Sequence, residues 1–515
     1  MNGADRLCDL LLANDVDVCF ANPGTSEMHF VAALDRKPEM RCVLGLFEGV
    51  VTGAADGYAR MAGKPAATLL HLGPGLGNGL ANLHNARRAE TPMINIVGDH
   101  ATYHLQYDAP LTSDIESIAR PMSNWVRTIA SVDAMDRDTG DAYAAAVSLP
   151  GVATLILPAD VAWSPAAETP VERTERPLPA AISEELLGTV IDALRSDQRV
   201  MIMLSGTALR AEPLRAASAI AAKTKARLMA QTSNARMERG AGRVTIEKLP
   251  YRIDLAVETM RDVDVLVLIG AIAPAAFFAY PSKPGVPYRD DCDVIHLASS
   301  ASDLPALLSR MAHELGATEV PSPSSPGQPT AAPEDGALTG ESVCRMVARA
   351  IPEGAVICDE SISSGASFYG LSHESAPHDY LELTGGAIGV GIPLSLGASL
   401  ACPDRKVICL QADGSGMYTV QGLWSQAREN ADVLTIVLAN RTYGTLHFEM
   451  RNVGVNQFGE NASMMLNLDK PDLDWVSLAK GMGVDGGHAT TVAEFASLLK
   501  TGLARKGPFL IQASI

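Results

Sequence analysis

Short apolar runs alternate with longer amphipathic stretches along most of the chain. In the first third, each run leads into polar residues or glycines, and the runs cover residues 16–21, 42–46, 66–70, 93–97 and 153–157. Strand, loop and helix repeated in this order are typical of a parallel sheet. Because functional loops lie at the carboxyl ends of such strands, the residues after each run are the first candidates for chemistry.

The same rhythm returns twice further along the chain. Runs at 200–204, 226–230, 263–270 and 294–297 predict a second α/β unit, and runs at 407–410, 433–438 and 507–512 predict a third. A Pro-, Glu- and Ala-rich stretch at 166–182 and a Pro/Ser stretch at 321–329 indicate exposed linkers. We therefore predict an α/β protein of three doubly wound parallel-sheet domains, over residues 1–165, 183–315 and 338–515.

Composition narrows the class of protein. A length of 515 residues suits about three domains, and 47% hydrophobic with 19% charged residues indicates a soluble globular chain. The net charge of −18 argues against a nucleic-acid partner, and no apolar run is long enough to span a membrane. No secretory signal is visible, and the eight cysteines form no CxxC pair, so we expect free thiols and a cytoplasmic protein.

The strongest chemical pattern is Asp413-Gly414-Ser415 followed by Asn440, 27 residues after Asp413. Both segments follow predicted strands, so the carboxylate and the amide oxygen should meet at one edge of a sheet. Oxygen ligands of this kind suit Mg²⁺ together with the phosphates of a ligand. Glycine lets the backbone approach a diphosphate closely. The pattern predicts a magnesium-diphosphate site.

Glu48 is the best candidate for an acid, because it begins a predicted helix of small and apolar residues that reaches Arg60. The helix dipole favours its anion while burial favours its neutral form. A carboxyl group in that balance can exchange a proton with a ring nitrogen at neutral pH. The alternative is an ordinary acid at a helix N-terminus.

Three separated motifs resemble those of the thiamine-diphosphate (ThDP)-dependent 2-oxo acid decarboxylase and acetolactate synthase superfamily. They are Asn-Pro-Gly-Thr-Ser-Glu at 22–27, Glu48 with its Ala-Asp-Gly-Tyr-Ala-Arg helix, and the stretch from Asp413 to Asn440, in which Ala412 replaces the usual first glycine. The resemblance covers all three predicted domains. It implies a ThDP-binding fold, with an N-terminal aminopyrimidine domain and a C-terminal diphosphate domain flanking a middle domain.

The resemblance also implies site residues. Glu48 would act on the aminopyrimidine ring, and Asp413, Asn440 and Thr442 would hold Mg²⁺. Ile388 would be the apolar wedge under a V-shaped ThDP, with simple core packing as its alternative. The implied cofactor-binding set is Gly385, Gly386, Ile388, Gly414, Ser415, Ser363 and Asn78.

In this superfamily the cofactor lies between two subunits. Glu48 would therefore serve a cofactor held by a neighbour, in a homo-oligomer that is a dimer or a dimer of dimers, a homotetramer.

His71 distinguishes the branches of the superfamily. It ends a predicted strand before a glycine-rich loop, where benzoylformate decarboxylase has a histidine and acetolactate synthases typically do not. Thr25 stands where that decarboxylase has a catalytic serine. The resemblance thus implies that Glu48, His71 and Thr25 catalyse non-oxidative decarboxylation of a small 2-oxo acid through an enamine, releasing an aldehyde. A purely structural histidine is the alternative for His71.

Two features depart from that decarboxylase. Residues 273–280 contain no histidine where it has a second one, so His100 or His104 could replace it unless they are ordinary loop residues. Thr445, His447 and Glu449 make the region after the metal motif more polar, unless they are surface residues of a helix. The candidate substrate contacts are Ser26, His100, His104, Thr445, His447 and Glu449.

Two rival functions remain open. The first is an acetolactate synthase-like carboligase, which joins the enamine to a second carbonyl compound. The second is a non-catalytic ThDP-fold binding or regulatory subunit, against which Glu48 argues. The predicted middle domain contains no GxGxxG motif, so no FAD is expected.

Overall fold

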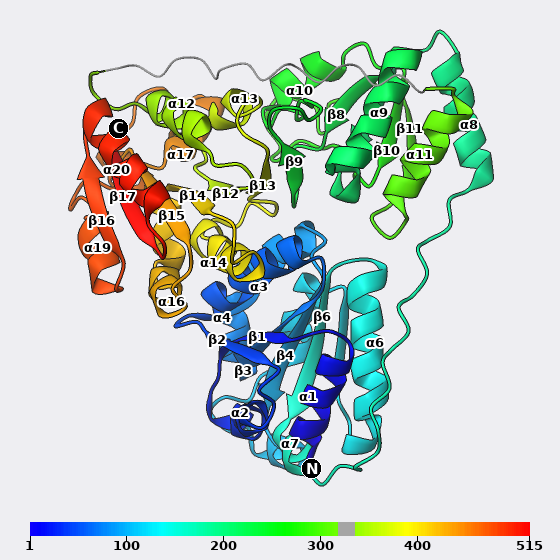
Figure 1. The fold of residues 1–515 in the computed structure, drawn as a ribbon, viewed down its shortest axis with the longest axis vertical. Helices are drawn as coiled ribbons and strands as arrows, with labels where there is room; N and C mark the ends of the chain where they lie inside the picture. The colour runs from blue at the N-terminus through cyan, green and yellow to red at the C-terminus, as the bar shows by residue number, and fades with distance from the viewer. Residues whose placement is uncertain (318–334) are drawn as a thin grey trace.

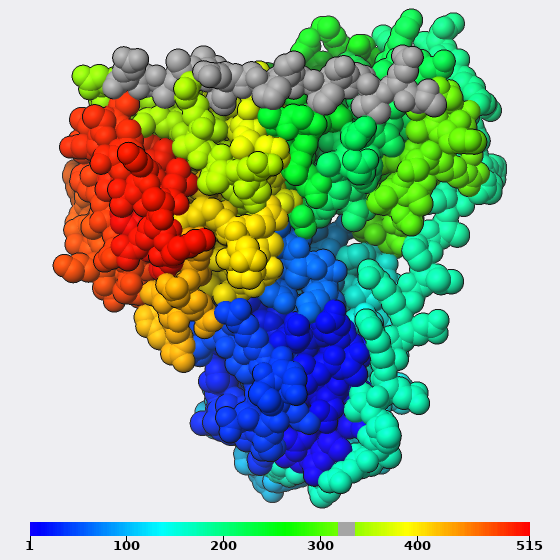
Figure 2. All heavy atoms as spheres, viewed as in Figure 1, coloured from blue at the N-terminus to red at the C-terminus, as the bar shows by residue number. Residues whose placement is uncertain are grey.

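Three sheets flanked by helices make up the computed structural model, which describes residues 1–317 and 335–515 (Figure 1). The predicted linker at 321–329 lies outside the described residues. Residues 166–182 contain no helix or strand and run along the side of the molecule, from the N-terminal lobe at the bottom of Figures 1 and 2 to helix α8.

The first sheet is fully parallel, in the order β2-β1-β3-β4-β6-β5. Strand β5 was not predicted from the sequence. Helices α1, α2, α6 and α7 pack on one another on one face, and α3, α4 and α5 pack on one another on the other face. The elements are β1 (Val18–Asn22), β2 (Arg41–Leu44), β3 (Ala66–His71), β4 (Met93–Asp99), β5 (Trp125–Thr128), β6 (Val152–Pro158), α1 (Gly3–Ala13), α2 (Met28–Asp35), α3 (Glu48–Ala62), α4 (Leu72–Arg88), α5 (Ile115–Ala119), α6 (Met135–Ser148) and α7 (Ala159–Trp163).

The second sheet is also parallel, in the order β11-β10-β7-β8. All four strands coincide with predicted apolar runs. The elements are β7 (Val200–Leu204), β8 (Arg227–Ala230), β10 (Val265–Ile269), β11 (Asp293–Ala298), α8 (Glu184–Arg195), α9 (Ala211–Thr224), α10 (Ile253–Met260) and α11 (Leu304–Glu314).

The third sheet has the order β16-β17-β15-β14-β12-β13-β9 and is parallel except for its last pair. Its strands are β9 (Met237–Arg239), β12 (Val356–Glu360), β13 (His378–Glu382), β14 (Val407–Ala412), β15 (Val433–Ala439), β16 (Asp485–Ala489) and β17 (Phe509–Ser514). Its helices are α12 (Gly340–Ala350), α13 (Phe368–Leu371), α14 (Gly391–Ala401), α15 (Asp413–Gly416), α16 (Gly422–Arg428), α17 (Gly444–Asn452), α18 (Glu460–Leu466), α19 (Trp475–Gly481) and α20 (Val492–Ala504).

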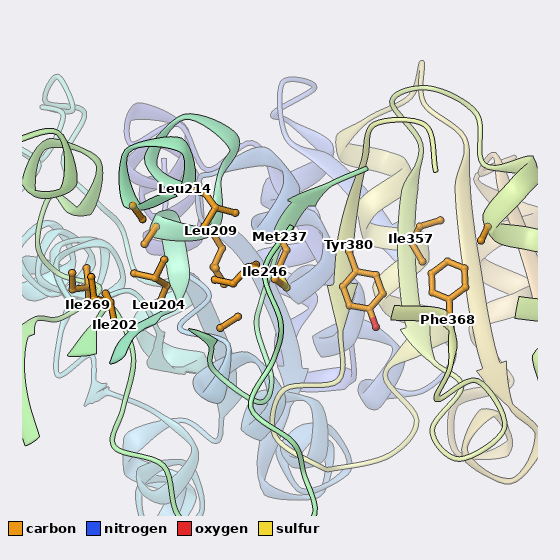
Figure 3. Close-up of a cluster of buried hydrophobic side chains, with 14 of the residues drawn as sticks. Ile202, Leu204, Leu209, Leu214, Met237, Ile246, Ile269, Ile357, Phe368 and Tyr380 are labelled. Atoms are coloured by element: carbon orange, nitrogen blue, oxygen red, sulfur yellow. The ribbon is translucent and has the colours of Figure 1, made fainter. Parts of the chain in front are cut away.

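Strand β9 joins the second and third sheets. It lies in sequence between β8 and β10 but pairs antiparallel with β13. Met237 of β9 belongs to the same buried cluster as Ile202 of β7 and Tyr380 of β13, and Figure 3 shows these side chains along one continuous row. The second and third sheets therefore share a hydrophobic core, which fixes their mutual orientation.

The first and third sheets meet through helices α3 and α14. A Cβ atom on Gly57 would lie 2.0 Å from the carbonyl oxygen of Leu394, so the two backbones touch. Arg60 pairs with Asp56 inside this contact and donates to the Glu382 carbonyl at 2.9 Å and the Ala235 carbonyl at 3.2 Å. The Ala-Asp-Gly-Tyr-Ala-Arg motif is thus the point where all three parts of the chain are joined.

Two general expectations can be compared with the described residues. None of their helices combines the length and the apolar character that crossing a bilayer would require. All eight cysteines are free thiols.

Candidate active site

Glu48 starts α3 and is 7% exposed. Asn78, on the neighbouring helix α4, donates a hydrogen bond from Nδ2 to Glu48 Oε2 at 3.0 Å. Among the described residues no cation pairs with Glu48. Glu48 is therefore a buried acid whose side-chain hydrogen bond comes from a neutral amide.

His71 ends β3 and contacts the loop that follows β1. Its Nδ1 lies 2.8 Å from Glu27 Oε2 and 3.2 Å from the Ser26 hydroxyl, which itself donates to Glu27. Glu27 also accepts the backbone N–H of Gly24 at 2.7 Å, so the acid is fixed by its own turn. The imidazole is consequently oriented by a carboxylate at Nδ1, the kind of contact that sets the tautomer of a histidine.

The structure gives Thr25, Ser26 and Glu27 different surroundings within one turn. The Thr25 side chain is exposed, and it is the neighbouring Ser26 that contacts His71. Glu27 was part of the quoted motif, but no role was predicted for it. A glutamate three residues after Gly24 is the usual position for capping a short turn, and that signal could have identified it.

His100 and His104 follow β4 on the same lobe as His71. Their rings lie 5.6 Å apart, and the backbone N–H of His100 donates to Asp99. Burial raises the pKa of the Asp99 carboxyl above its usual range. His100 Nε2 is buried without a hydrogen-bond partner among the described residues, so this nitrogen is available to a ligand.

Asp413 follows β14, and Asn440 follows the adjacent strand β15. The two Asp413 oxygens accept the backbone N–H groups of Gly414 at 2.8 Å and Arg441 at 2.7 Å. Asn440 donates from Nδ2 to the Ser364 hydroxyl at 2.9 Å. These bonds orient one carboxylate and one amide oxygen at the same edge of the sheet, as the strand pattern predicted.

The surroundings of this pair supply further oxygen atoms. Thr442 donates its hydroxyl proton to the Leu466 carbonyl at 3.0 Å, and a Cβ on Gly444 would lie 2.7 Å from the Ser363 hydroxyl. Ser415 is buried in the Asp413 turn. Ser415 therefore lies in the turn that carries Gly414, while Thr442 belongs to the segment after Asn440 and Ser363 contacts that segment at Gly444.

Burial raises the pKa of the Asp413 carboxyl, and its backbone hydrogen bonds oppose that rise. Among the described residues no side-chain cation pairs with it, and no cluster of three His, Cys, Asp or Glu side chains could hold a metal. A hard cation carried by a diphosphate fits this donor set, because Mg²⁺ is usually held by one or two protein oxygens, phosphates and water.

The turn that carries Ile388 packs against α4 of the same chain. Asn85 donates to the Ala387 carbonyl at 2.7 Å and accepts the Gly385 N–H at 3.2 Å, while Asn82 donates to the Gly389 carbonyl at 3.2 Å. A Cβ on Gly386 would lie 2.6 Å from the Phe277 ring, which comes from the segment 273–280. Ile388 is half-buried on a turn held from two sides.

Helix α17 follows Asn440 and carries the last three predicted residues. His447 Nε2 lies 3.0 Å from Asn467 Oδ1, and Glu449 accepts the Tyr280 hydroxyl at 2.6 Å. Burial, together with the neighbouring Glu449 carboxylate, raises the pKa of Tyr280 well above its usual value. Thr445 is half-buried on the same helix. His447 and Glu449 are thus engaged by protein partners, and Glu449 links α17 to the segment that contacts Gly386.

The two halves of the site are not bonded directly to each other. Across residues 1–317 and 335–515, no hydrogen bond or ion pair joins Glu48, His71 or Thr25 to Asp413, Asn440 or Thr442. Asn82, one helical turn after Asn78, donates to the Gly389 carbonyl and so links α4 to the Ile388 turn of the same chain. One chain therefore presents an acid–imidazole half and a metal–diphosphate half.

Two cavities lie in the second sheet's region. The larger, about 520 Å³, opens at the amino ends of β7 and β8 beside Arg195, Lys223 and Arg227. The other, about 180 Å³, lies at the carboxyl ends beside Ser205 and Gly270. The carboxyl end is where such sheets bind nucleotides, but this cavity is smaller than the roughly 300–1,000 Å³ that a drug-sized ligand occupies. The absence of FAD stays a prediction.

Comparison with protein families agrees with this geometry. The N-terminal TPP binding domain of thiamine pyrophosphate enzymes matches residues 1–118, and their C-terminal TPP binding domain matches residues 364–513. Thiamine pyrophosphate is the same compound as ThDP. The first match contains Glu48 and His71, and the second contains Asp413 and Asn440.

Similar proteins span the whole chain. A Mycobacterium tuberculosis protein assigned as an acetolactate synthase large subunit, IlvX, is 47% identical and covers 100% of this chain and 99% of its own. Benzoylformate decarboxylase of Pseudomonas aeruginosa is 29% identical, with 98% and 97% covered. The ThDP-dependent 4-hydroxybenzoylformate decarboxylase of Rhodococcus jostii superposes with a TM-score of 0.86 at 25% identity over 100% and 99%. This chain therefore belongs to the thiamine pyrophosphate enzyme family.

Proposed function

We propose that this protein is a ThDP- and Mg²⁺-dependent decarboxylase that converts a 2-oxo acid to an aldehyde without oxidation. The observation that carries the proposal is the contact of His71 with Glu27 and Ser26 at the carboxyl ends of β3 and β1. An imidazole fixed by a buried acid can deliver a proton to carbon, which is the step that ends in an aldehyde.

Each half of the site has a defined task in this proposal. Asp413, Asn440 and Thr442 would hold Mg²⁺ together with a diphosphate. When bound, ThDP supplies the carbanion-stabilising chemistry. Glu48 holds a proton at the aminopyrimidine nitrogen, and Asn78 keeps the Glu48 carboxyl in place. Ser26 or Thr25 binds the substrate carboxylate beside His71.

A second candidate is a carboligase like acetolactate synthase. The 47% identity to the IlvX protein favours it, because that relative is assigned as an acetolactate synthase large subunit. In a carboligase, the reacting carbon forms a bond to a second carbonyl compound and does not receive a proton. His71 favours the decarboxylase, since a positioned acid beside the reacting carbon promotes protonation. A non-catalytic ThDP-binding subunit is a third reading, and the buried, cation-free Glu48 argues against it.

Product analysis separates these functions. Purified protein with ThDP and Mg²⁺ is incubated with a panel of aliphatic and aromatic 2-oxo acids, and the products are identified by mass spectrometry. Aldehyde as the main product supports decarboxylation, and a hydroxyketone supports the carboligase. Cofactor binding with no turnover of any substrate would support the non-catalytic subunit.

We further propose that two copies of the chain complete each site in a symmetric homo-oligomer, either a dimer or a homotetramer, since no hydrogen bond joins Glu48 to Asp413 or Asn440 within the described residues of one chain. Light scattering with and without ThDP measures the mass of the oligomer.

We also propose the domain boundaries 1–165, 183–315 and 338–515, and a cytoplasmic location. Limited proteolysis should cut near 166–182, between the first two domains.

A further inference from the structure

Glu360 is a buried carboxylate that contacts the turn carrying Ile388. It ends β12 and is 1% exposed. Its Oε1 accepts the backbone N–H of Gly389 at 2.6 Å, and its Oε2 accepts the backbone N–H of Gly391 at 2.7 Å. No sequence motif pointed to Glu360. Its two oxygens fix the residue immediately after Ile388 and the first residue of α14.

The turn itself has little freedom to adopt another arrangement. Gly389 has a φ of +97°, a conformation that side chains other than glycine rarely adopt, and a Cβ there would lie 2.6 Å from the Tyr418 Cβ. The Gly389 carbonyl accepts the Thr419 hydroxyl at 2.9 Å in addition to Asn82. Glu360 therefore completes a set of contacts that holds Gly389 on both its N–H and its carbonyl side.

Gln411 extends this set of contacts to the metal turn. Its side-chain amide donates to Glu360 Oε2 at 3.0 Å and to the Ser415 hydroxyl at 2.7 Å. A Cβ on Gly391 would lie 2.4 Å from Gln411 Oε1, so the two segments are in close contact. A chain of hydrogen bonds thus runs from the turn of Ile388 through Glu360 and Gln411 to Ser415, two residues after Asp413.

The chemistry of this site requires a carboxylate. Three N–H donors, from Gly389, Gly391 and Gln411, point at the two oxygens of Glu360. A carboxylate only accepts, whereas a glutamine would turn an N–H₂ group toward one of these donors. Burying a carboxylate is costly unless its oxygens are hydrogen-bonded, and these three donors supply such bonds.

We propose that Glu360 is a positioning residue that fixes the Ile388 turn relative to the Asp413–Ser415 turn, and so holds the bound cofactor in its bent shape. This inference rests on the proposed ThDP function. Glu360 touches neither substrate nor cofactor in this scheme and acts through the Ile388 turn. The alternative is that Glu360 only stabilises the fold.

Glu360→Gln tests the proposal, with Asp432→Asn as the matched control. Asp432 is also a buried acid of the third sheet, but it lies at the opposite end of β15 from Asn440, where it pairs with Lys406 and Lys506. Three measurements are compared: ThDP affinity by calorimetry with Mg²⁺, the near-ultraviolet circular dichroism of bound ThDP, and kcat and KM. Urea unfolding of each cofactor-free variant measures stability.

Glu360→Gln should lower kcat by roughly 10- to 100-fold, the range expected for losing a hydrogen bond to a charged group, and should reduce the dichroism band of ThDP while KM changes little. Asp432→Asn should keep wild-type kcat and dichroism even where it loses comparable stability. Wild-type kcat and dichroism in a Glu360→Gln variant of reduced stability would overturn the proposal.

A second variant covers the case in which Glu360→Gln does not fold. Gln411→Met removes the link to Ser415 and leaves Glu360 in place, so it should give a smaller change in the same direction, and unchanged dichroism would overturn the proposal. Wild-type protein that binds ThDP but decarboxylates nothing would reject the proposed function, while the affinity and dichroism comparison would still decide the role of Glu360. Wild-type protein that binds no ThDP would reject both.

Discussion

Glu27 and His71 form an acid–imidazole pair in which the acid is the more deeply buried partner. Glu27 Oε2 lies 2.8 Å from His71 Nδ1, and their side chains are 1% and 20% exposed. A carboxylate at Nδ1 fixes the orientation of the ring, while Nε2 has no hydrogen-bond partner among the described residues. The pair therefore places an oriented imidazole at the end of β3.

Removing the imidazole should abolish most turnover. His71→Ala is expected to lower the rate of aldehyde formation by about 10²- to 10⁴-fold, the usual contribution of a general acid or base, with ThDP affinity nearly unchanged. His313→Ala, an exposed histidine at the end of α11, is the control. Unchanged aldehyde formation in His71→Ala would contradict the assignment to the decarboxylase branch.

Glu27→Gln should act through His71 by weakening the contact that orients its ring. An amide can turn its N–H₂ group toward the imidazole, so the 2.8 Å contact between Glu27 Oε2 and His71 Nδ1 should be lost in part and kcat should fall by roughly 10-fold while KM changes little. Measuring kcat, KM and ThDP affinity for wild type and variant checks this expectation. Wild-type kcat in Glu27→Gln would show that Glu27 does not position the imidazole.

Glu48→Gln should lower kcat while leaving the affinity for ThDP nearly unchanged. The amide can still accept from Asn78 but cannot deliver a proton to the ring nitrogen, so kcat should fall by about 10²- to 10⁴-fold. Calorimetry should show ThDP affinity within a few-fold of wild type. Glu39→Gln, an exposed glutamate after α2, is the control, and wild-type turnover in Glu48→Gln would remove Glu48 from the mechanism.

The sequence predicted the parts of the fold that are built from apolar runs. Strands β7, β14 and β15 lie on such runs because central parallel strands are buried on both faces. Strand β13 (His378–Glu382) carries buried polar residues, paired for example with Arg236, and offers no apolar pattern. Strand β9 is three residues long and belongs to a sheet whose other strands lie far away in sequence.

The candidate site likewise contains residues that sequence patterns locate and residues that they do not. Glu48, Asp413 and Asn440 lie at strand or helix ends that the periodicity locates, so their positions follow from sequence. The burial of Glu27 against His71 and of Glu360 against the Gly389 turn depends on contacts between segments distant in sequence. No local pattern carries that information, because acids at a strand end or in a short turn, like these two, are as often exposed as buried.

Asp413→Asn should abolish stabilisation by the metal and the cofactor. ThDP with Mg²⁺ should raise the thermal midpoint of the wild type, because ligand at ~100 times its Kd adds about 2.7 kcal/mol. The variant lacks the carboxylate ligand, so this rise should disappear, and chelating Mg²⁺ from the wild type should have the same effect. Asp404→Asn, an exposed acid before β14, should keep the full rise, and a metal-dependent rise in Asp413→Asn would contradict the predicted ligand set.

Glu360 should give the cofactor-free protein a measurable pH dependence. Burial raises its pKa from the ordinary 4.5 to about 7, against the opposing effect of its hydrogen bonds. The folded state thus binds this proton more tightly than the unfolded chain. The resulting contribution to the free energy of unfolding is complete below about pH 4.5 and is lost as the pH rises through 7.

The comparison with Glu360→Gln isolates this effect, because the glutamine does not titrate. Between pH 5 and 8, wild type should lose stability relative to the variant, by about 1.4 kcal/mol for each unit by which its pKa is raised. The ionised form accepts all three N–H donors, so the dichroism of bound ThDP should strengthen over the same range in the wild type only. Urea unfolding and dichroism at each pH measure both trends, and a stability difference that does not vary with pH would contradict the raised pKa of Glu360.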